Sequence, residues 1–108
     1  MPKSINKKES TKKHPLVGSW VSGTEYGSDI EYIVTSHGTG FRVRVIDRYD
    51  EEVGDVFEVK WDGEILSFAT HLNSTGRFLR VRLQALAENE VSHTYTYTEM
   101  EIWQRKPA

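Results

Sequence analysis

From residue 14 onward, the chain is a succession of short stretches rich in Val, Ile, Tyr, Phe, Trp and Thr that are separated by turn-forming residues. Stretches of β-branched and aromatic residues bounded by Gly, Asn, Asp and Ser are typical of β-strands. None of them shows the periodicity of an amphipathic helix. The sequence therefore predicts strands at residues 16–22, 29–35, 41–47, 56–61, 65–72, 78–87 and 91–104.

The links between these predicted strands are short and carry strong turn signals. Residues 36–40 include two glycines that can adopt positive φ, and Asp62-Gly63 is a favoured hairpin dipeptide. Parallel neighbours need a long crossover, so short links predict antiparallel pairing of consecutive strands. We therefore expect an all-β fold, a single antiparallel up-and-down meander barrel or half-barrel of about seven to eight strands, because closure hides unpaired sheet edges.

The composition limits the possible domains and compartments. A chain of 108 residues accommodates one domain, and without cysteine it has neither disulfides nor thiolate metal ligands. We assign residues 1–14 to a disordered basic tail, which has five lysines, and residues 15–106 to a single β-barrel domain. No apolar segment follows the lysines, and no apolar run approaches the ~20 residues of a membrane helix. These features predict a cytoplasmic protein that does not contact a membrane.

The charge distribution argues against a nucleic-acid partner. The formal net charge is −2. The tail alone carries a charge of about +4, which leaves about −6 on the rest of the chain. An acidic domain lacks the clustered basic surface that nucleic-acid binding requires.

The two ends of the predicted domain carry a pair of motifs that belong together. The first strand contains Gly18-Ser19-Trp20, and the last predicted strand ends in Glu-Ile-Trp-Gln-Arg at residues 101–105. Together they resemble the calycin superfamily, which includes lipocalins and fatty-acid-binding proteins. The resemblance implies that Trp20 closes one end of the barrel, that Arg105 packs across it, and that Gly18 allows their close approach. These three residues would form a structural clasp, and a domain shorter than a usual lipocalin implies a smaller cavity or none.

The last two predicted strands carry the one group of side chains that suggests a binding site. We expect a hairpin that turns at Asn89-Glu90, with Glu88 opposite Val91 and Arg80 opposite Glu99. Strand periodicity then gathers polar and aromatic side chains on one face, namely Arg80, Arg82, His93, Tyr95 and Tyr97. The other face carries apolar and small side chains, namely Leu79, Val81, Leu83, Ser92, Thr94 and Thr96.

Two orientations of this hairpin are open. If the arginine and tyrosine face points inward, it lines a cavity for a small, partly apolar anion, because arginine binds carboxylates bidentately and aromatic walls supply apolar contact. Fatty-acid-binding proteins, by resemblance, use Arg and Tyr of late strands in this way. If the face points outward, Leu79, Val81 and Leu83 form the core and Arg80–Glu99 is a surface pair. The cost of burying two unpaired arginines favours the outward orientation.

Three functions follow as hypotheses. The first is non-enzymatic binding of the anionic ligand by the five side chains of the inward face. The second is a protein-interaction or homodimerisation surface, because Tyr, Trp and Arg dominate interfaces. Its candidate residues are Tyr95, Tyr97, Trp103, Arg80 and Arg82. The third is a small barrel isomerase or cyclase in which His93 and an acid, Glu99 or Asp47, exchange protons.

The sequence lacks the motifs of the common enzyme and metal classes. There is no Gly-x-Ser-x-Gly elbow, phosphate-binding loop or HExxH motif. His37, His71 and His93 lie in three separate segments without the spacing of metal ligands. We therefore predict no metal, no cofactor and no catalytic residue, and a non-enzymatic role is the first hypothesis.

Overall fold

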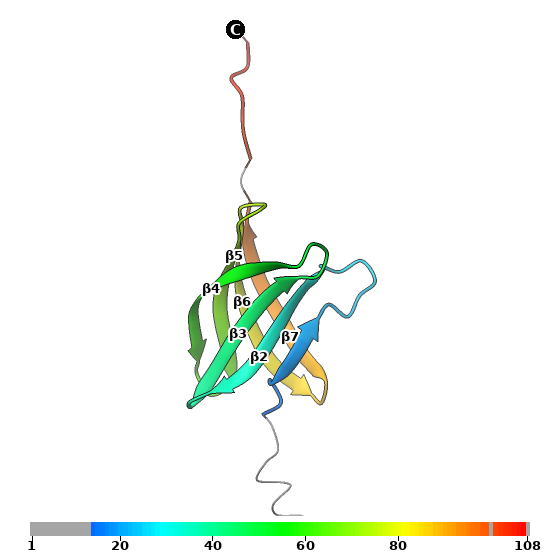
Figure 1. The fold of residues 1–108 in the computed structure, drawn as a ribbon, viewed down its shortest axis with the longest axis vertical. Coiled ribbons are helices and arrows are strands. Elements are labelled where there is room, and N and C mark those ends of the chain that lie inside the picture. The colour runs from blue at the N-terminus through cyan, green and yellow to red at the C-terminus, as the bar shows by residue number, and fades with distance from the viewer. Residues whose placement is uncertain (1–13, 100, 108) are drawn as a thin grey trace, which may run out of the picture.

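The computed structural model of the protein describes residues 14–99 and 101–107, which form strands, turns and extended segments without a helix. The strands are β1 (Gly18–Val21), β2 (Ile30–His37), β3 (Gly40–Asp47), β4 (Glu52–Trp61), β5 (Ile65–Leu72), β6 (Arg77–Ala87) and β7 (Glu90–Thr98). Each strand pairs antiparallel with the next one along the chain. The sheet curls into an open half-barrel whose edge strands, β1 and β7, are not paired with each other (Figure 1). The predicted all-β, antiparallel up-and-down fold is confirmed.

The core lies on the concave side of the curled sheet. Alternate side chains point to it, as strand geometry requires: Ile30, Tyr32 and Val34 of β2 are buried, whereas the intervening side chains are more exposed. Burying one Val or Leu side chain contributes about 1.5–3 kcal/mol, so this single cluster supplies most of the hydrophobic free energy that stabilises the fold. Its members are Leu16, Ile30, Tyr32, Val34, Val43, Val45, Leu66, Phe68, Leu72, Leu79, Val81 and Leu83.

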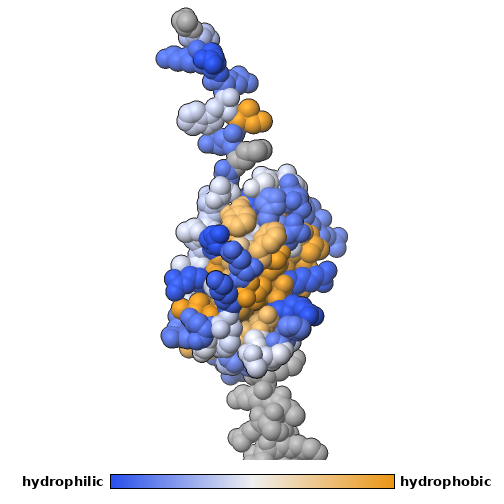
Figure 2. Space-filling view, turned by 90° about the vertical axis from the view of Figure 1, so that its left-hand side faces the viewer, coloured by the Kyte–Doolittle hydropathy of each residue, from blue (hydrophilic) through white to orange (hydrophobic). Residues whose placement is uncertain are grey.

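Pairing between β3 and β4 is incomplete, which leaves a gap in the wall of the half-barrel. These strands pair only through residues 45–47 and residues 52–54. Further along, β4 follows β5 alone and carries a register shift between Phe57 and Lys60, where Glu58 has a φ of 54°. Apolar side chains are in view on the side of the molecule that carries β4 (Figure 2), and the part of β4 that does not pair with β3 contributes Phe57 and Val59 to this exposed surface.

Three aromatic rings pack together at one end of the gap between β3 and β4. Phe41 of β3 and Trp61 of β4 meet edge to face at 5.0 Å between ring centroids. The imidazole of His14 lies 5.1 Å from Phe41 and 5.3 Å from Trp61. Edge-to-face contacts at these separations are favourable, so the rings join β3 and β4 where no backbone hydrogen bond does.

Two predicted strand boundaries are wrong in an informative way. β4 begins at Glu52, before the predicted start at residue 56, because the turn is formed by residues 48–51. β7 ends at Thr98, whereas the prediction extended it to residue 104. Since Thr98 lies opposite Phe78 and β6 begins at Arg77, little of β6 is left for later residues to pair with. The described residues 101–107 are exposed and run away from the sheet (Figure 1).

The predicted basic tail covers residues 1–14. Of these, residues 1–13 lie outside the part of the chain that the structure describes.

Candidate functional site

A pocket opens on the concave side of the sheet, along the seam between the two unpaired edges. Its volume is about 510 Å³, within the range of small-molecule sites. The side chains that shape it come from β1, β2, β6, β7 and the loop after β1, so it lies where the half-barrel fails to close. Apolar walls include Trp20, Ile30, Leu79, Leu83 and Val91, and polar groups include Tyr32, Arg77, His93, Tyr95, Tyr97 and Glu99.

The turn between β6 and β7 differs from the predicted one. It is formed by Glu88 and Asn89, with Ala87 opposite Glu90. Asn89 has a φ of 65°, a conformation that asparagine tolerates well. The observed turn therefore lies one residue earlier than the predicted turn at Asn89-Glu90. This displacement changes the pairing of the two strands by two residues, so by itself it would leave each side chain on its predicted face.

A bulge next to this turn then changes the faces. The register shifts between Ala85 and Ala87, so Leu86 has no opposite residue on β7. From there Leu83 lies opposite His93, Val81 opposite Tyr95 and Leu79 opposite Tyr97. The predicted pairing of Arg80 with Glu99 is wrong, because one unpaired residue in β6 exchanges the two faces of β7 relative to those of β6.

The five predicted binding residues are consequently divided between the two faces. His93, Tyr95 and Tyr97 line the seam pocket, and the tyrosines remain 51% and 56% exposed. Arg80 and Arg82 are exposed on the outer face, opposite Thr96 and Thr94. The structure thus brings the aromatic residues together and separates them from both arginines.

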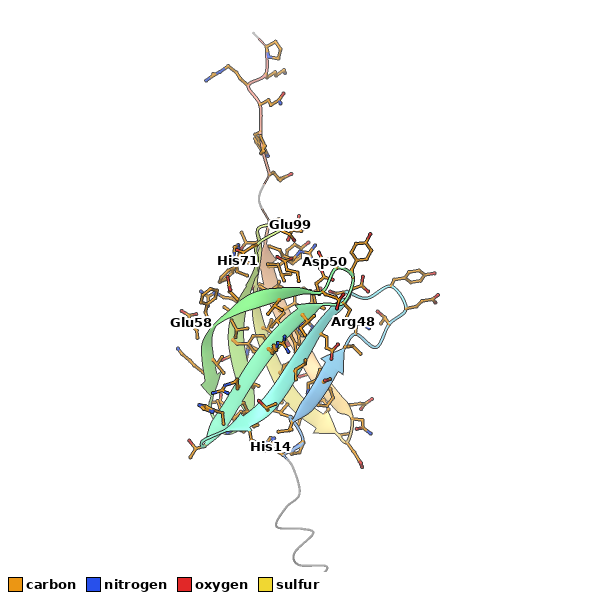
Figure 3. The ribbon with its side chains drawn as sticks, in the orientation of Figure 1. His14, Arg48, Asp50, Glu58, His71 and Glu99 are labelled. Carbon is orange, nitrogen blue, oxygen red and sulfur yellow. The ribbon has the colours of Figure 1, made fainter. Side chains whose placement is uncertain are left out.

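Arg80 forms an ion pair on the outer face with a residue that the prediction did not assign to it. Its Nη1 donates to Glu58 Oε2 of β4 at 2.9 Å, with more than half of each side chain exposed. The guanidinium also lies 5.5 Å from the centre of the Phe78 ring. Figure 3 shows Glu58 on the outer side of β4, away from Glu99, which lies where β7 ends.

An arginine that the sequence prediction missed lines the pocket. Arg77 is the first residue of β6 and the only Arg or Lys among the described residues that line the pocket. Its Nε atom is buried and has no hydrogen-bond partner in the described part of the chain. Arg77 precedes Leu79 by two positions, so strand periodicity places it on the core face. The predicted strand begins at residue 78 and the predicted turn ends at residue 76, so neither includes Arg77.

Two ionisable groups meet inside the pocket. The Tyr32 hydroxyl and His93 Nε2 are 3.0 Å apart and share a hydrogen bond across the half-barrel. Burial raises the pKa of Tyr32 well above its usual value, and partial burial lowers the pKa of His93. Both are therefore neutral near pH 7, and the tautomer of His93 sets which of the two groups donates this hydrogen bond. The His93 ring also stacks on Tyr95 at 4.8 Å.

The predicted acid–base partners of His93 lie in different places. Glu99 lines the same pocket as His93. Asp47 lies at the end of β3, where its carboxylate accepts a hydrogen bond from the Tyr49 backbone N–H at 2.9 Å. Of the two acids, only Glu99 shares the pocket.

The residues of the predicted clasp are also separated. Trp20 packs against the core, and its indole N–H donates to the Leu16 carbonyl at 2.8 Å. Gly18 has a φ of 147°, in the range that favours glycine. Arg105 is exposed in the segment that leaves the sheet. The structure therefore does not bring Arg105 to Trp20.

Among residues 14–99 and 101–107, no three His, Asp or Glu side chains converge to hold a metal ion. No helix in this part of the chain is long and apolar enough to cross a membrane.

Comparison of the chain with family models, with curated proteins and with solved structures gives no match.

Proposed function

We propose that the protein binds a small, partly apolar anion in the seam pocket, with Arg77 holding the charged group. The observation that supports this most directly is the buried Nε of Arg77, which has no hydrogen-bond partner among the described residues. A buried donor without a partner costs about 1–3 kcal/mol. A carboxylate or similar anion at this position would recover that cost through a charge-assisted hydrogen bond.

The rest of the pocket suits the apolar part of such a ligand. Trp20, Leu79 and Leu83 provide an apolar wall, while Tyr95 and Tyr97 supply rings and hydroxyls at the open side. A predominantly apolar lining with a few polar groups is typical of small-molecule sites. This proposal keeps the ligand class expected from the calycin-like sequence motifs but moves the anchoring charge from Arg80 and Arg82 to Arg77.

Glu99 sharpens the electrostatic prediction. Continuing the β6–β7 register places Glu99 opposite Arg77, and both line the pocket. A carboxylate next to the anchoring cation competes with an anionic ligand for it. Removing the charge of Glu99 should therefore strengthen binding, in the opposite direction to removing the charge of Arg77.

The test uses anilinonaphthalene sulfonate, an apolar anion that becomes fluorescent on binding. Arg77→Gln should weaken its binding about tenfold to a hundredfold, as expected for the loss of a hydrogen bond between charged groups. The matched control is Arg82→Gln, which removes the same charge from the outer face and should change the affinity less than about twofold. Circular dichroism excludes binding by a loosened variant.

Equal effects of Arg77→Gln and Arg82→Gln would overturn the proposal, as would weaker binding by Glu99→Gln. Native mass spectrometry of the protein purified from its own host supplies the second readout. A retained small molecule that is lost in Arg77→Gln, but kept in Arg82→Gln, would identify the natural ligand.

A second candidate function is supported by the hydrogen bond between Tyr32 and His93. A neutral histidine in a pocket is available as a general base, and a tyrosine hydroxyl beside it can relay a proton. An isomerase or cyclase of this kind predicts that His93→Asn abolishes turnover of a bound substrate while its affinity changes little. If His93→Asn leaves turnover unchanged, the acid–base role is excluded.

A further inference from the structure

The outer edge of β7 has no strand partner in the described structure. β7 pairs with β6 along one side, and β1 does not pair with the other (Figure 1). On that free side, alternate residues of the strand present backbone N–H and C=O groups that no strand satisfies. Nine residues is a long edge for a small sheet.

After its first residue, Glu90, β7 also lacks the features by which edge strands usually avoid pairing. Residues 91–98 read Val-Ser-His-Thr-Tyr-Thr-Tyr-Thr, with no Pro, Lys, Arg, Asp or Glu. Short length, charged side chains and bulges are the usual protection. The other exposed edges have them: β1 has four residues, and the free part of β4 carries a bulge at Glu58 followed by Lys60.

We propose that β7 pairs antiparallel with β7 of a second copy about a two-fold axis, making a homodimer with a continuous sheet. A two-fold axis perpendicular to the sheet pairs each residue with one of the same face. With the axis at Thr94, the middle of the strand, outward Ser92 meets the partner's Thr96. On the inner face, His93 meets the partner's Tyr95. Hydroxyl and aromatic pairs of these kinds are the favourable cross-strand pairs of antiparallel sheets.

The proposed register keeps the C-terminal segment out of the interface. With the axis at Thr94, Thr98 lies beside the partner's Glu90, so residues 101–107 extend beyond the partner's β6–β7 turn. The charge of this segment nearest to that turn is Glu101, and Arg105 and Lys106 lie further along. β7 alone therefore forms the contact.

The size of the contact sets the expected affinity. The nine residues of β7 fall short of the ~20–30 residues a side of a standard interface. We therefore expect a dissociation constant in the micromolar range. The dimer does not depend on a bound ligand, so its failure and the failure of the proposed binding function are distinguishable.

Sedimentation of the full chain from about 1 to 200 micromolar provides the first test. The protein should change from monomer to dimer over this range. Thr94→Lys places two like charges at the axis and should raise the dissociation constant at least about tenfold. The matched control, Thr35→Lys, makes the same change on an exposed outward position of the internal strand β2 and should dimerise like the parent chain.

Cysteine cross-linking locates the axis, since the chain has no native cysteine. Directly opposed residues of antiparallel strands lie within disulfide range. Thr94→Cys should oxidise to a covalent dimer, whereas Thr35→Cys should not. A chain that stays monomeric throughout the concentration range, or equal cross-linking of the two variants, would overturn the proposal.

Discussion

The inner and outer faces of the β6–β7 hairpin are made from one alternating sequence, yet they have opposite physical properties. Leu79, Val81 and Leu83 on the inner face are at most 6% exposed, whereas Arg80 and Arg82 point into solvent. The tyrosines of β7 join the apolar face and the threonines join the arginines. The difference shows that one unpaired residue, Leu86, decides whether the aromatic rings line a pocket or a surface.

The strongest way to break this comparison is to delete one residue of β7. Removing Ser92 shifts every later residue of β7 to the opposite face, unless β6 forms a wider bulge. Either outcome buries threonines or leaves backbone groups unpaired, so we expect a loss of at least about 3 kcal/mol in the free energy of unfolding. Urea unfolding of the purified variant measures it.

The control for this prediction is deletion of Leu86. That change removes the bulge but leaves Ala85 opposite Val91, so the faces are unchanged. The variant should fold with stability close to that of the parent chain. If both deletions are equally damaging, the bulge does not determine the faces in the way we describe.

The two faces should respond differently to truncation of one side chain. Leu83 is 1% exposed, and Leu83→Ala should cost about 2–5 kcal/mol, because it removes buried contacts and leaves a cavity. Arg82→Ala, one position earlier on the outer face, should change stability by less than about 0.5 kcal/mol. Thermal and urea unfolding of both variants gives the comparison, and similar losses would contradict the assignment of the faces.

The outer face itself should contribute little through its ion pair. Arg80 and Glu58 are both more than half exposed, so solvent screens their attraction. A double-mutant cycle with Arg80→Met and Glu58→Gln should give a coupling of about 0.2–1 kcal/mol. Raising the salt concentration should reduce it, and a coupling independent of salt would argue against this ion pair.

The smallest expected effect comes from His93 on the inner face. Because its pKa is lowered in the folded protein, the neutral form is favoured by folding. Its contribution is present above the ordinary histidine pKa and is lost as pH falls through the lowered value. The parent chain should lose stability between about pH 7 and pH 5, and His93→Gln should reduce this loss. An unchanged pH profile in the variant would exclude His93 as the cause.

Sequence reasoning found the elements of the fold well but not their interruptions. Residues 65–72 were predicted with the observed bounds of β5, because β-branched and aromatic residues lie between two strong turns. The early start of β4 was missed because Glu52, Gly54 and Asp55 are poor strand formers that tertiary pairing nevertheless holds in the sheet. The end of β7 was missed because it depends on where β6 begins.

The candidate site could be predicted only in part. His93, Tyr95 and Tyr97 line the pocket, whereas both predicted orientations kept them on one face with Arg80 and Arg82. The arginines did not accompany them, since a bulge has no reliable sequence signal in Ala-Leu-Ala. Arg77 could have been predicted from the sequence, because it is two positions before Leu79 and therefore belongs to the same face of the strand.

What the sequence by itself determined is the succession of strands, their antiparallel order and the alternation along each one. These follow from local propensity and turn chemistry, which act over a few residues. The tertiary structure alone decided which alternating set faces inward, where the sheet stops pairing and which charge enters the pocket. A period of two has no preferred face until burial of Leu79, Val81 and Leu83 with the rest of the core selects one, and a single bulged residue then sets the face of the neighbouring strand.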